Sequence, residues 1–155
     1  MDERREETDF DLAVVGAGAA GQMAAIVAAE AGQRVVVLEQ MPETGMKILA
    51  SGGGRANITH EMPNDAFAAT FGRQGRFILP ALTHMGPTEL RAFFARLGVP
   101  TLVDDHARVY PASERAADVQ KALLRQMGQL GVQVNLNCLV STLCLEEGAL
   151  AGVET

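Results

Sequence analysis

The stretch that decides the fold is Asp11-Leu12-Ala13-Val14-Val15-Gly16-Ala17-Gly18-Ala19-Ala20-Gly21, close to the N-terminus. The nearly all-apolar run from Phe10 to Val15 predicts a parallel strand that is covered on both faces. The three glycines that follow suit a chain that turns sharply, approaches a diphosphate and packs a helix on a strand. The start of that helix presents free backbone N–H groups and the positive end of its dipole to an anion.

The residues after the glycines complete a strand–helix–strand unit. Residues 22–31 are alanine-rich and predict a helix that Gly32 ends, and residues 34–39 predict a second buried strand. The second strand ends at Glu39, which lies 23 residues after Gly16. An acid about 20 residues on is placed to accept hydrogen bonds from ribose hydroxyls. A carboxylate would repel a 2′-phosphate, so this site favours FAD or NAD over NADP.

A glycine-rich segment follows where a plain dinucleotide fold would place its second helix. It contains Ser51-Gly52-Gly53-Gly54-Arg55-Ala56-Asn57, preceded by Lys47. Three consecutive glycines favour neither helix nor strand, because each loses much backbone entropy on ordering. We interpret the segment as a ligand-contacting loop, since backbone can approach a ligand closely there. A flexible surface loop is the alternative interpretation.

The remaining chain predicts further helices and strands by its periodicity. Residues 63–80 predict a short helix and irregular chain, residues 87–98 an amphipathic helix, and residues 99–103 and 108–110 two strands joined by a turn. Ser113 is expected to cap a helix from about Glu114 to Leu130, which Gly131 ends. A strand at 132–138 and a hairpin formed by 140–145 and 149–153 complete the prediction.

Composition excludes several classes of protein. The 155 residues are 48% hydrophobic and carry a formal net charge of −6, which argues against a dedicated nucleic-acid binder. Neither a secretory signal nor a membrane-spanning run is evident, so we expect a cytoplasmic protein without membrane partners. Residues 1–9 are expected to form a flexible tail, and 10–155 one domain. Cys138 and Cys144 lack metal-type spacing, so we expect reduced thiols and no metal site.

Several segments together resemble the HI0933-like flavoproteins, a bacterial family also described as BaiN-like or aminoacetone-oxidase-like NAD(P)/FAD-dependent oxidoreductases. The segments that carry the resemblance are Val14–Glu39, Gly45–Thr59, Phe71–Phe77 and Leu97–Pro111. The serine–triple-glycine–arginine segment is much more specific than the first glycine motif. The resemblance covers essentially the whole chain after the tail.

The resemblance implies an α/β fold, a Rossmann-like FAD/NAD(P)-binding domain with a parallel sheet, helices and β-hairpin additions. It implies FAD as the cofactor and a set of cofactor-binding residues. The pyrophosphate would be bound by Gly16, Ala17, Gly18, Ala19, Ala20 and Gly21, the adenosine side by Glu39, Gln40 and the backbone of Val140, and the flavin side by Lys47, Ser51, Gly52, Gly53, Arg55 and Asn57.

Two departures from the family bear on catalysis. The family usually has cysteine between the arginine and the asparagine of the glycine segment, and Ala56 stands there, so no thiol mechanism is assigned. Family members also have about two domains' worth of chain, and this sequence resembles their N-terminal portion. We therefore expect a sequence truncated relative to the family, without the substrate domain, and assign no catalytic residue. His60, His84 and His106 are expected to be structural or solvated.

These observations lead to one functional hypothesis and keep two others open. The leading one is the FAD-binding portion of an oxidoreductase that passes a hydride from NAD(P)H through FAD to a small organic substrate, such as an activated alkene; an oxidase reaction is its converse. An NAD-binding dehydrogenase domain is the first alternative. The other is an inactive flavoprotein fragment that acts only as a binding module and self-associates through surface left uncovered.

Overall fold

The structure, a computed structural model, describes residues 9–155, so most of the predicted tail at 1–9 lies outside the described residues. In chain order the elements are β1 (Leu12–Val15), α1 (Ala19–Glu30), β2 (Val35–Leu38), α2 (Met46–Ala50), the 3₁₀ turn η1 (Ser51–Gly54), β3 (Thr59–His60), α3 (Asn64–Ala69), η2 (Gly72–Gln74), α4 (Gly75–His84), α5 (Pro87–Arg96), β4 (Thr101–Val103), β5 (Arg108–Pro111), α6 (Ala116–Gln129), β6 (Gln133–Asn135), β7 (Thr142–Glu146) and β8 (Ala149–Glu154). None of the helices within 9–155 is long and apolar enough to cross a bilayer.

Two compact units make up the described chain. The first contains residues up to 47 together with 123–155, and the second contains residues 48–122. The division passes through α2 and α6, so each of these helices contributes residues to both units. The two units are described separately below.

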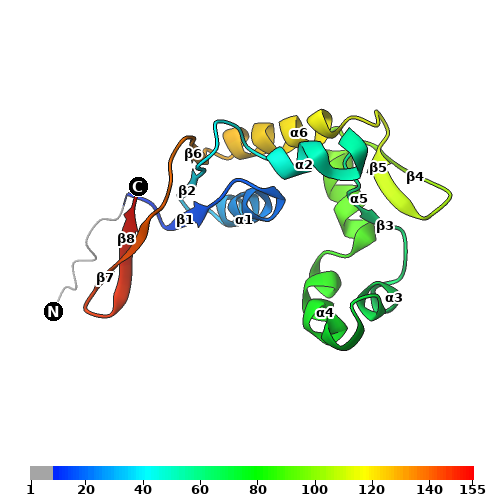
Figure 1. The fold of residues 1–155 in the computed structure, drawn as a ribbon, viewed down its shortest axis with the longest axis horizontal. Coiled ribbons are helices and arrows are strands. Elements are labelled where there is room, and N and C mark those ends of the chain that lie inside the picture. Colours follow the sequence, from blue (N-terminus) through cyan, green and yellow to red (C-terminus); the bar gives the residue numbers. More distant parts are fainter. Residues whose placement is uncertain (1–8) are drawn as a thin grey trace. The chain divides into compact units, whose positions relative to one another are not determined.

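The first unit contains the predicted Rossmann-type parallel sheet. Its strand order is β1-β2-β6, and both pairings are parallel, with Val14 opposite Val37 and Val37 opposite Val134. Helix α1 packs against β1 and β2, as the ribbon in Figure 1 shows. Ala25 and Ile26 of α1 and all four residues of β2 are buried between these layers. The α/β fold class with a parallel sheet and helices is confirmed.

Strand β1 departs from the prediction of a strand covered on both faces. It lies at the edge of the sheet, with β2 as its neighbour on one side. Leu12 is 37% exposed and Val15 is 58% exposed, whereas the central strand β2 is buried throughout. An apolar run therefore identified the strand correctly, but burial depends on how many strands flank it.

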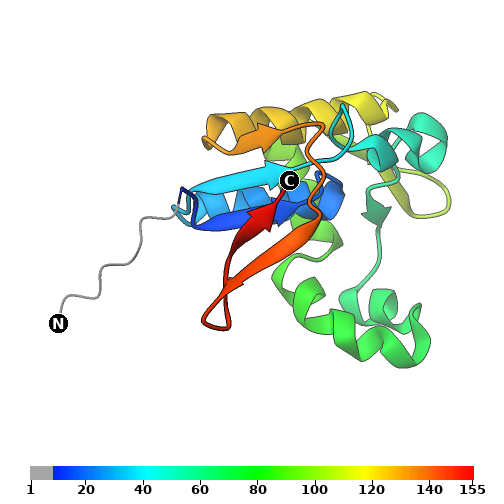
Figure 2. The same cartoon turned by 60° about the vertical axis from the view of Figure 1, so that its left-hand side comes forward.

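A separate antiparallel hairpin, β7-β8, ends the chain and lies at its red end in Figure 2. The predicted turn is confirmed, because Glu147 and Gly148 both have positive φ, 48° and 84°. Two successive left-handed residues match the twist of a hairpin. The leucines Leu143, Leu145 and Leu150 on this hairpin are all more than 60% exposed.

The second unit is built on a small antiparallel sheet with order β3-β5-β4, against which α5 packs. Its core includes Phe93, Phe94, Val109 and Tyr110. The predicted pair of strands around residues 104–107 is confirmed as β4-β5. Asp104 fixes that turn, since its carboxylate accepts hydrogen bonds from the backbone N–H groups of His106 and Arg108, both 2.9 Å long.

The region 63–80 is more helical than predicted. Helices α3 and α4 flank the short turn η2, and α4 continues through Pro80 to His84. Gly75 explains the difference: a Cβ there would be 2.1 Å from the carbonyl oxygen of Ala68, so this glycine is where α4 contacts α3. The glycines in this region do not break the chain into an irregular segment, and Gly75 permits the two helices to pack closely.

Helix α6 begins two residues later than predicted, at Ala116. Glu114 has φ of 52°, and its N–H donates to the carbonyl of Pro111 at 2.8 Å. Residues 111–114 thus form a turn, and Ser113 is not the cap of the helix. The predicted end is confirmed, because Gly131 has φ of 75° directly after the last turn.

Candidate functional site

The glycine turn between β1 and α1 has the geometry that its sequence predicts. Gly16 has φ of 95°, a conformation that side-chain-bearing residues rarely adopt, so the chain reverses there. A Cβ on Gly21 would be 2.0 Å from the carbonyl oxygen of Gly16, so glycine lets the helix contact the turn. A Cβ on Gly18 would have no atom within 4 Å, which leaves open space beside its backbone.

The N-terminus of α1 has no capping side chain and no acidic residue in its own first turn. Its N-cap is Gly18, which has no side chain that could cap the helix. The first N–H groups of a helix have no intrahelical acceptor. Together with the helix dipole they favour an anion at this position.

Glu39 ties the end of β2 to this turn. Its side chain is buried, with 9% exposure, and one carboxylate oxygen accepts the N–H of Ala17 at 2.6 Å. The other oxygen accepts the N–H of Met41 at 2.9 Å. Each carboxylate oxygen retains a lone pair, so the group can still accept from a hydroxyl. The predicted acid therefore holds the turn and faces the site with acceptor capacity.

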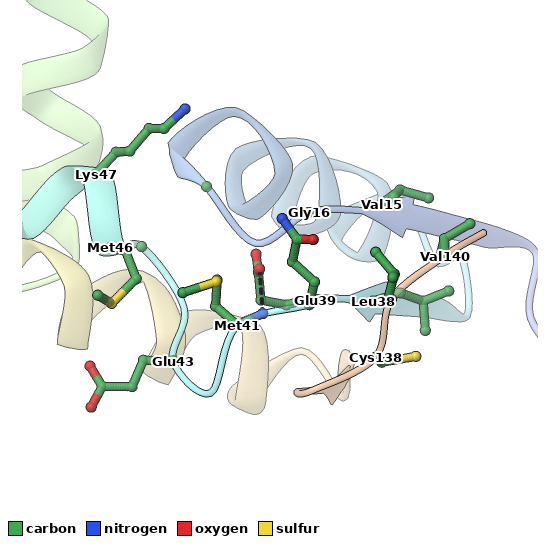
Figure 3. A pocket seen from close by; sticks show the side chains of 14 residues that line it. Val15, Gly16, Leu38, Glu39, Met41, Glu43, Met46, Lys47, Cys138 and Val140 are labelled. Atoms are coloured by element: carbon green, nitrogen blue, oxygen red, sulfur yellow. Dashed lines mark hydrogen bonds between the residues drawn. The ribbon is translucent and has the colours of Figure 1, made fainter. Parts of the chain in front are cut away.

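A pocket of about 490 Å³ lies beside these groups, within the first unit. That volume falls in the range of small-molecule sites. Figure 3 shows Glu39 with Met41 close to it, and Val15, Leu38 and Val140 together along one wall. The lining residues are Val15, Gly16, Gly18, Leu38, Glu39, Gln40, Met41, Glu43, Gly45, Met46, Lys47, Cys138, Leu139 and Val140.

The segment after β6 crosses the end of β2 and forms one side of the pocket. The N–H of Cys138 donates to the carbonyl of Glu39 at 2.8 Å, and that of Asn137 donates to Met41 at 3.2 Å. These bonds place Cys138, Leu139 and Val140 at the site. Sequence reasoning found Val140 but missed Met41 and Cys138, because no local pattern signals a contact between segments about 100 residues apart.

The triple-glycine segment belongs to the second unit, and Lys47 belongs to the first. Gly52, Gly53 and Gly54 all have positive φ, between 57° and 87°, and Ala56 also has φ of 59°. A Cβ on Gly52 would be 2.9 Å from the N of Asn57 and 3.1 Å from the Tyr110 ring. The segment is therefore an ordered left-handed turn and not a featureless loop.

Arg55 is held by groups that the sequence did not identify. Its guanidinium lies 4.3 Å from the centre of the buried Tyr110 ring and 3.3 Å from Glu114. Its Nε donates to the carbonyl of Gly52 at 3.4 Å. Stacking on an aromatic ring and pairing with a carboxylate both favour a fixed cation. Only the fold brings residues 110 and 114 to residue 55.

Some of the predicted residues line the pocket of the first unit, and others belong to the second unit. Six of them line the pocket: Gly16, Gly18, Glu39, Gln40, Lys47 and Val140. Ala17 is hydrogen-bonded to Glu39, and Gly21 packs against the backbone of Gly16. Ala19 and Ala20 lie in the first turn of α1. Ser51, Gly52, Gly53, Arg55 and Asn57 belong to the second unit. None of the three histidines lines the pocket.

Known proteins resemble this chain in sequence and in fold. The chain is 34% identical over 136 residues to the 3-dehydro-bile acid delta(4,6)-reductase of Clostridium scindens, a match covering 86% of this chain and 32% of that protein. Among solved structures, the 3-ketosteroid-delta4-(5alpha)-dehydrogenase of Rhodococcus jostii superposes with a TM-score of 0.68 at 20% identity, over 97% of this chain and 43% of that one. THI4 of Thermovibrio ammonificans superposes with a TM-score of 0.66 at 16% sequence identity, over 94% of this chain and 46% of that one.

The chain thus spans about a third of the length of the bile acid reductase that it matches. The solved structures share its fold over nearly its whole length. The family model of the HI0933-like protein Rossmann domain matches residues 10–155, which include the glycine turn, Glu39 and the crossing segment. The chain therefore belongs to the HI0933-like family, as the resemblance of its glycine segments predicted.

Proposed function

We propose that this chain binds the ADP half of FAD in the pocket of the first unit and forms part of a flavin-dependent oxidoreductase. The observation that carries the proposal is the position of Glu39. A buried carboxylate with spare acceptor capacity lies 2.6 Å from the N of Ala17, in the glycine turn that leads into α1, and the start of α1 has no capping side chain. Backbone N–H donors that could bind a diphosphate and a carboxylate that could accept from ribose hydroxyls thus adjoin one pocket.

The residues present fit this group. The open space beside Gly18 leaves room for phosphate oxygens to approach the backbone, and the mixed lining of the pocket provides apolar contacts for a base. Val140, with its neighbours on the crossing segment, would contact the adenine. Lys47, Ser51, Gly52, Gly53, Arg55 and Asn57 would serve the flavin side. Glu39 would repel a 2′-phosphate, which supports FAD or NAD and opposes NADP at this site.

Bound FAD would supply the redox chemistry, accepting a hydride from NAD(P)H and delivering it to a small organic substrate. The bile acid reductase, by its name, acts on a 3-dehydro-bile acid, which supports a reductase acting on an activated alkene. The protein's own residues would hold the dinucleotide, orient its ribose and exclude 2′-phosphorylated nucleotides. We propose that the protein acts in the cytoplasm on a small molecule.

Ligand-dependent thermal stability tests the binding proposal. A ligand at about 100 times its Kd stabilises the folded state by about 2.7 kcal/mol. For a chain of this size that raises the melting temperature by roughly 5–10 °C. FAD and ADP are expected to do so, with quenching of flavin fluorescence by the protein, and NADPH is not. Stabilisation by NADH but not FAD would favour the dehydrogenase alternative.

Anaerobic mixing tests the hydride step separately. The FAD-loaded protein is expected to lose its visible flavin absorbance when NADH or NADPH is added. Bleaching by an amine or alcohol in place of a nicotinamide would support the oxidase direction. If neither class of donor bleaches the flavin, the reductase proposal is wrong for this chain even where FAD binds.

A further inference from the structure

Gln22, the fourth residue of helix α1, has a buried side-chain amide that does not line the pocket. Its side chain is 0% exposed. The Nε2 group donates to the carbonyl oxygen of Ala17 at 2.8 Å. The Oε1 atom is buried and has no hydrogen-bond partner among the described residues 9–155. Since a carbonyl oxygen can only accept, the nitrogen end of the amide must face Ala17.

The backbone of Ala17 is hydrogen-bonded by three other segments of the chain. Its carbonyl oxygen accepts a second hydrogen bond from the N–H of Gly45 at 2.8 Å, and the N–H of Ala17 donates to Glu39. Thus Gln22 from α1, Gly45 from the segment before α2 and Glu39 from the end of β2 all hold one residue of the glycine turn. Ala17 is fully buried as a result.

The orientation of this carbonyl determines the direction of the next backbone donor. Peptide bonds are planar, and the described chain contains no cis peptide. The N–H of Gly18 therefore points away from the oxygen of Ala17. Gly18 lines the pocket, and no Cβ would meet another atom there. With the oxygen drawn toward Gln22, the Gly18 donor is directed to the opposite side.

We infer that Gln22 is a positioning residue for the diphosphate: its amide fixes the Ala17–Gly18 peptide so that the Gly18 N–H is preset to donate to a phosphate oxygen. This inference rests on the proposed function. Gln22 does not touch the ligand and acts through the peptide it holds. Fixing a donor before binding removes an ordering cost from the binding step.

The unpaired Oε1 atom makes this role separable from a purely structural one. A buried acceptor without a partner destabilises the folded state. Gln22→Met keeps the length of the side chain and removes both the Nε2 donor and the unpaired Oε1 acceptor. The Ala17 carbonyl still accepts from Gly45. The variant is therefore expected to fold with a melting temperature no lower than that of the wild type while it binds a diphosphate less well.

The experiment compares ADP with adenosine, which lacks the diphosphate, by NMR titration of the whole chain. Gln22→Met is expected to weaken ADP binding about tenfold, the effect of about one hydrogen bond, and to leave adenosine binding unchanged. Gln129→Met, an exposed glutamine at the end of α6, is the matched control and should change neither affinity. Equal loss for ADP and adenosine, or no loss for ADP, overturns the inference.

Two further observations keep the test decisive. If Gln22→Met does not fold, hydrogen exchange of the Gln22 side-chain amide is measured in the wild type; slower exchange with ADP than with adenosine is expected, and equal rates overturn the inference. If the wild-type chain binds neither ADP nor FAD, the proposed function itself fails. If it binds both and Gln22→Met binds ADP equally well, only the positioning role fails.

Discussion

Replacing Gly21 by alanine tests the close contact between α1 and the glycine turn. The added Cβ would lie 2.0 Å from the oxygen of Gly16 and 3.3 Å from Cγ1 of Val14. Real Cβ atoms essentially never come within 3.0 Å of such an atom, so the helix and the turn must separate by about 1 Å. The Gly16 atoms that the added Cβ would meet, the carbonyl oxygen and carbon, belong to the backbone and cannot rotate away as a flexible side chain would.

The expected loss of stability follows from two opposing effects. Overpacking of a tight contact costs about 3 kcal/mol at the upper end of its usual range. Alanine in place of glycine within a helix contributes about 1 kcal/mol in the opposite direction. The free energy of unfolding should therefore fall by about 2 kcal/mol. With a urea m-value of about 2 kcal/mol per molar, the unfolding midpoint falls by about 1 M.

Urea unfolding followed by circular dichroism measures this change. Gly128→Ala is the matched control, because Gly128 is also a helical glycine but has no atom within 4 Å of an added Cβ. Its midpoint should stay at or slightly above that of the wild type, as helix propensity alone predicts. If Gly21→Ala also matches or exceeds the wild type, the helix does not contact the turn as described, and the reasoning is refuted.

Three further substitutions follow from the site and its surroundings. Glu39→Gln leaves the N–H of Ala17 or Met41 facing an NH₂ group, so it should lower the free energy of unfolding by about 1–3 kcal/mol and weaken FAD binding about tenfold or more. Glu43→Gln, at an exposed position of the same pocket, should change FAD affinity little, and equal effects of the two substitutions would contradict the role of Glu39. Gly52→Ala should destabilise the chain more than Gly53→Ala in urea unfolding, because both have positive φ but only Gly52 would bring a Cβ against Asn57 and Tyr110; the reverse order would contradict this packing. Desolvation alone would raise the pKa of Asp104, but hydrogen bonds from the backbone of Arg108 and His106 and from the Arg108 guanidinium lower it below its ordinary 3.8. The stability that ionised Asp104 contributes is therefore present above the pKa of this residue in the unfolded chain, and it is lost as pH falls through the lowered pKa in the folded chain. Urea midpoints measured from about pH 5 to about pH 2 should therefore decline less for Asp104→Asn than for wild type or Asp105→Asn.

Local sequence was sufficient for most elements of this fold. The run of apolar residues before Gly16, the alanine-rich helix and the second strand each depend on neighbours a few positions away. The turn at Glu147 and Gly148 and the end of α6 at Gly131 were also predictable, since left-handed residues are favoured by glycine and by few others. Predictions were wrong where packing decides the outcome: at Gly75, which packs against Ala68 of the preceding helix, and at β1, whose edge position in the sheet leaves Val15 exposed. The start of α6 was also wrong, because Glu114 forms a local turn with Pro111.

What the sequence by itself determined is the kind of site: a glycine turn, a helix start and an acid at the end of the second strand. These features lie within about 25 residues, and their spacing is set by backbone geometry alone. Tertiary structure alone decided how the parts are held. It brought Cys138 to Glu39, Tyr110 to Arg55 and Gly45 to the carbonyl of Ala17. Hydrogen bonds and ring contacts of this kind depend on which chain segments meet in space, and no local pattern encodes that meeting.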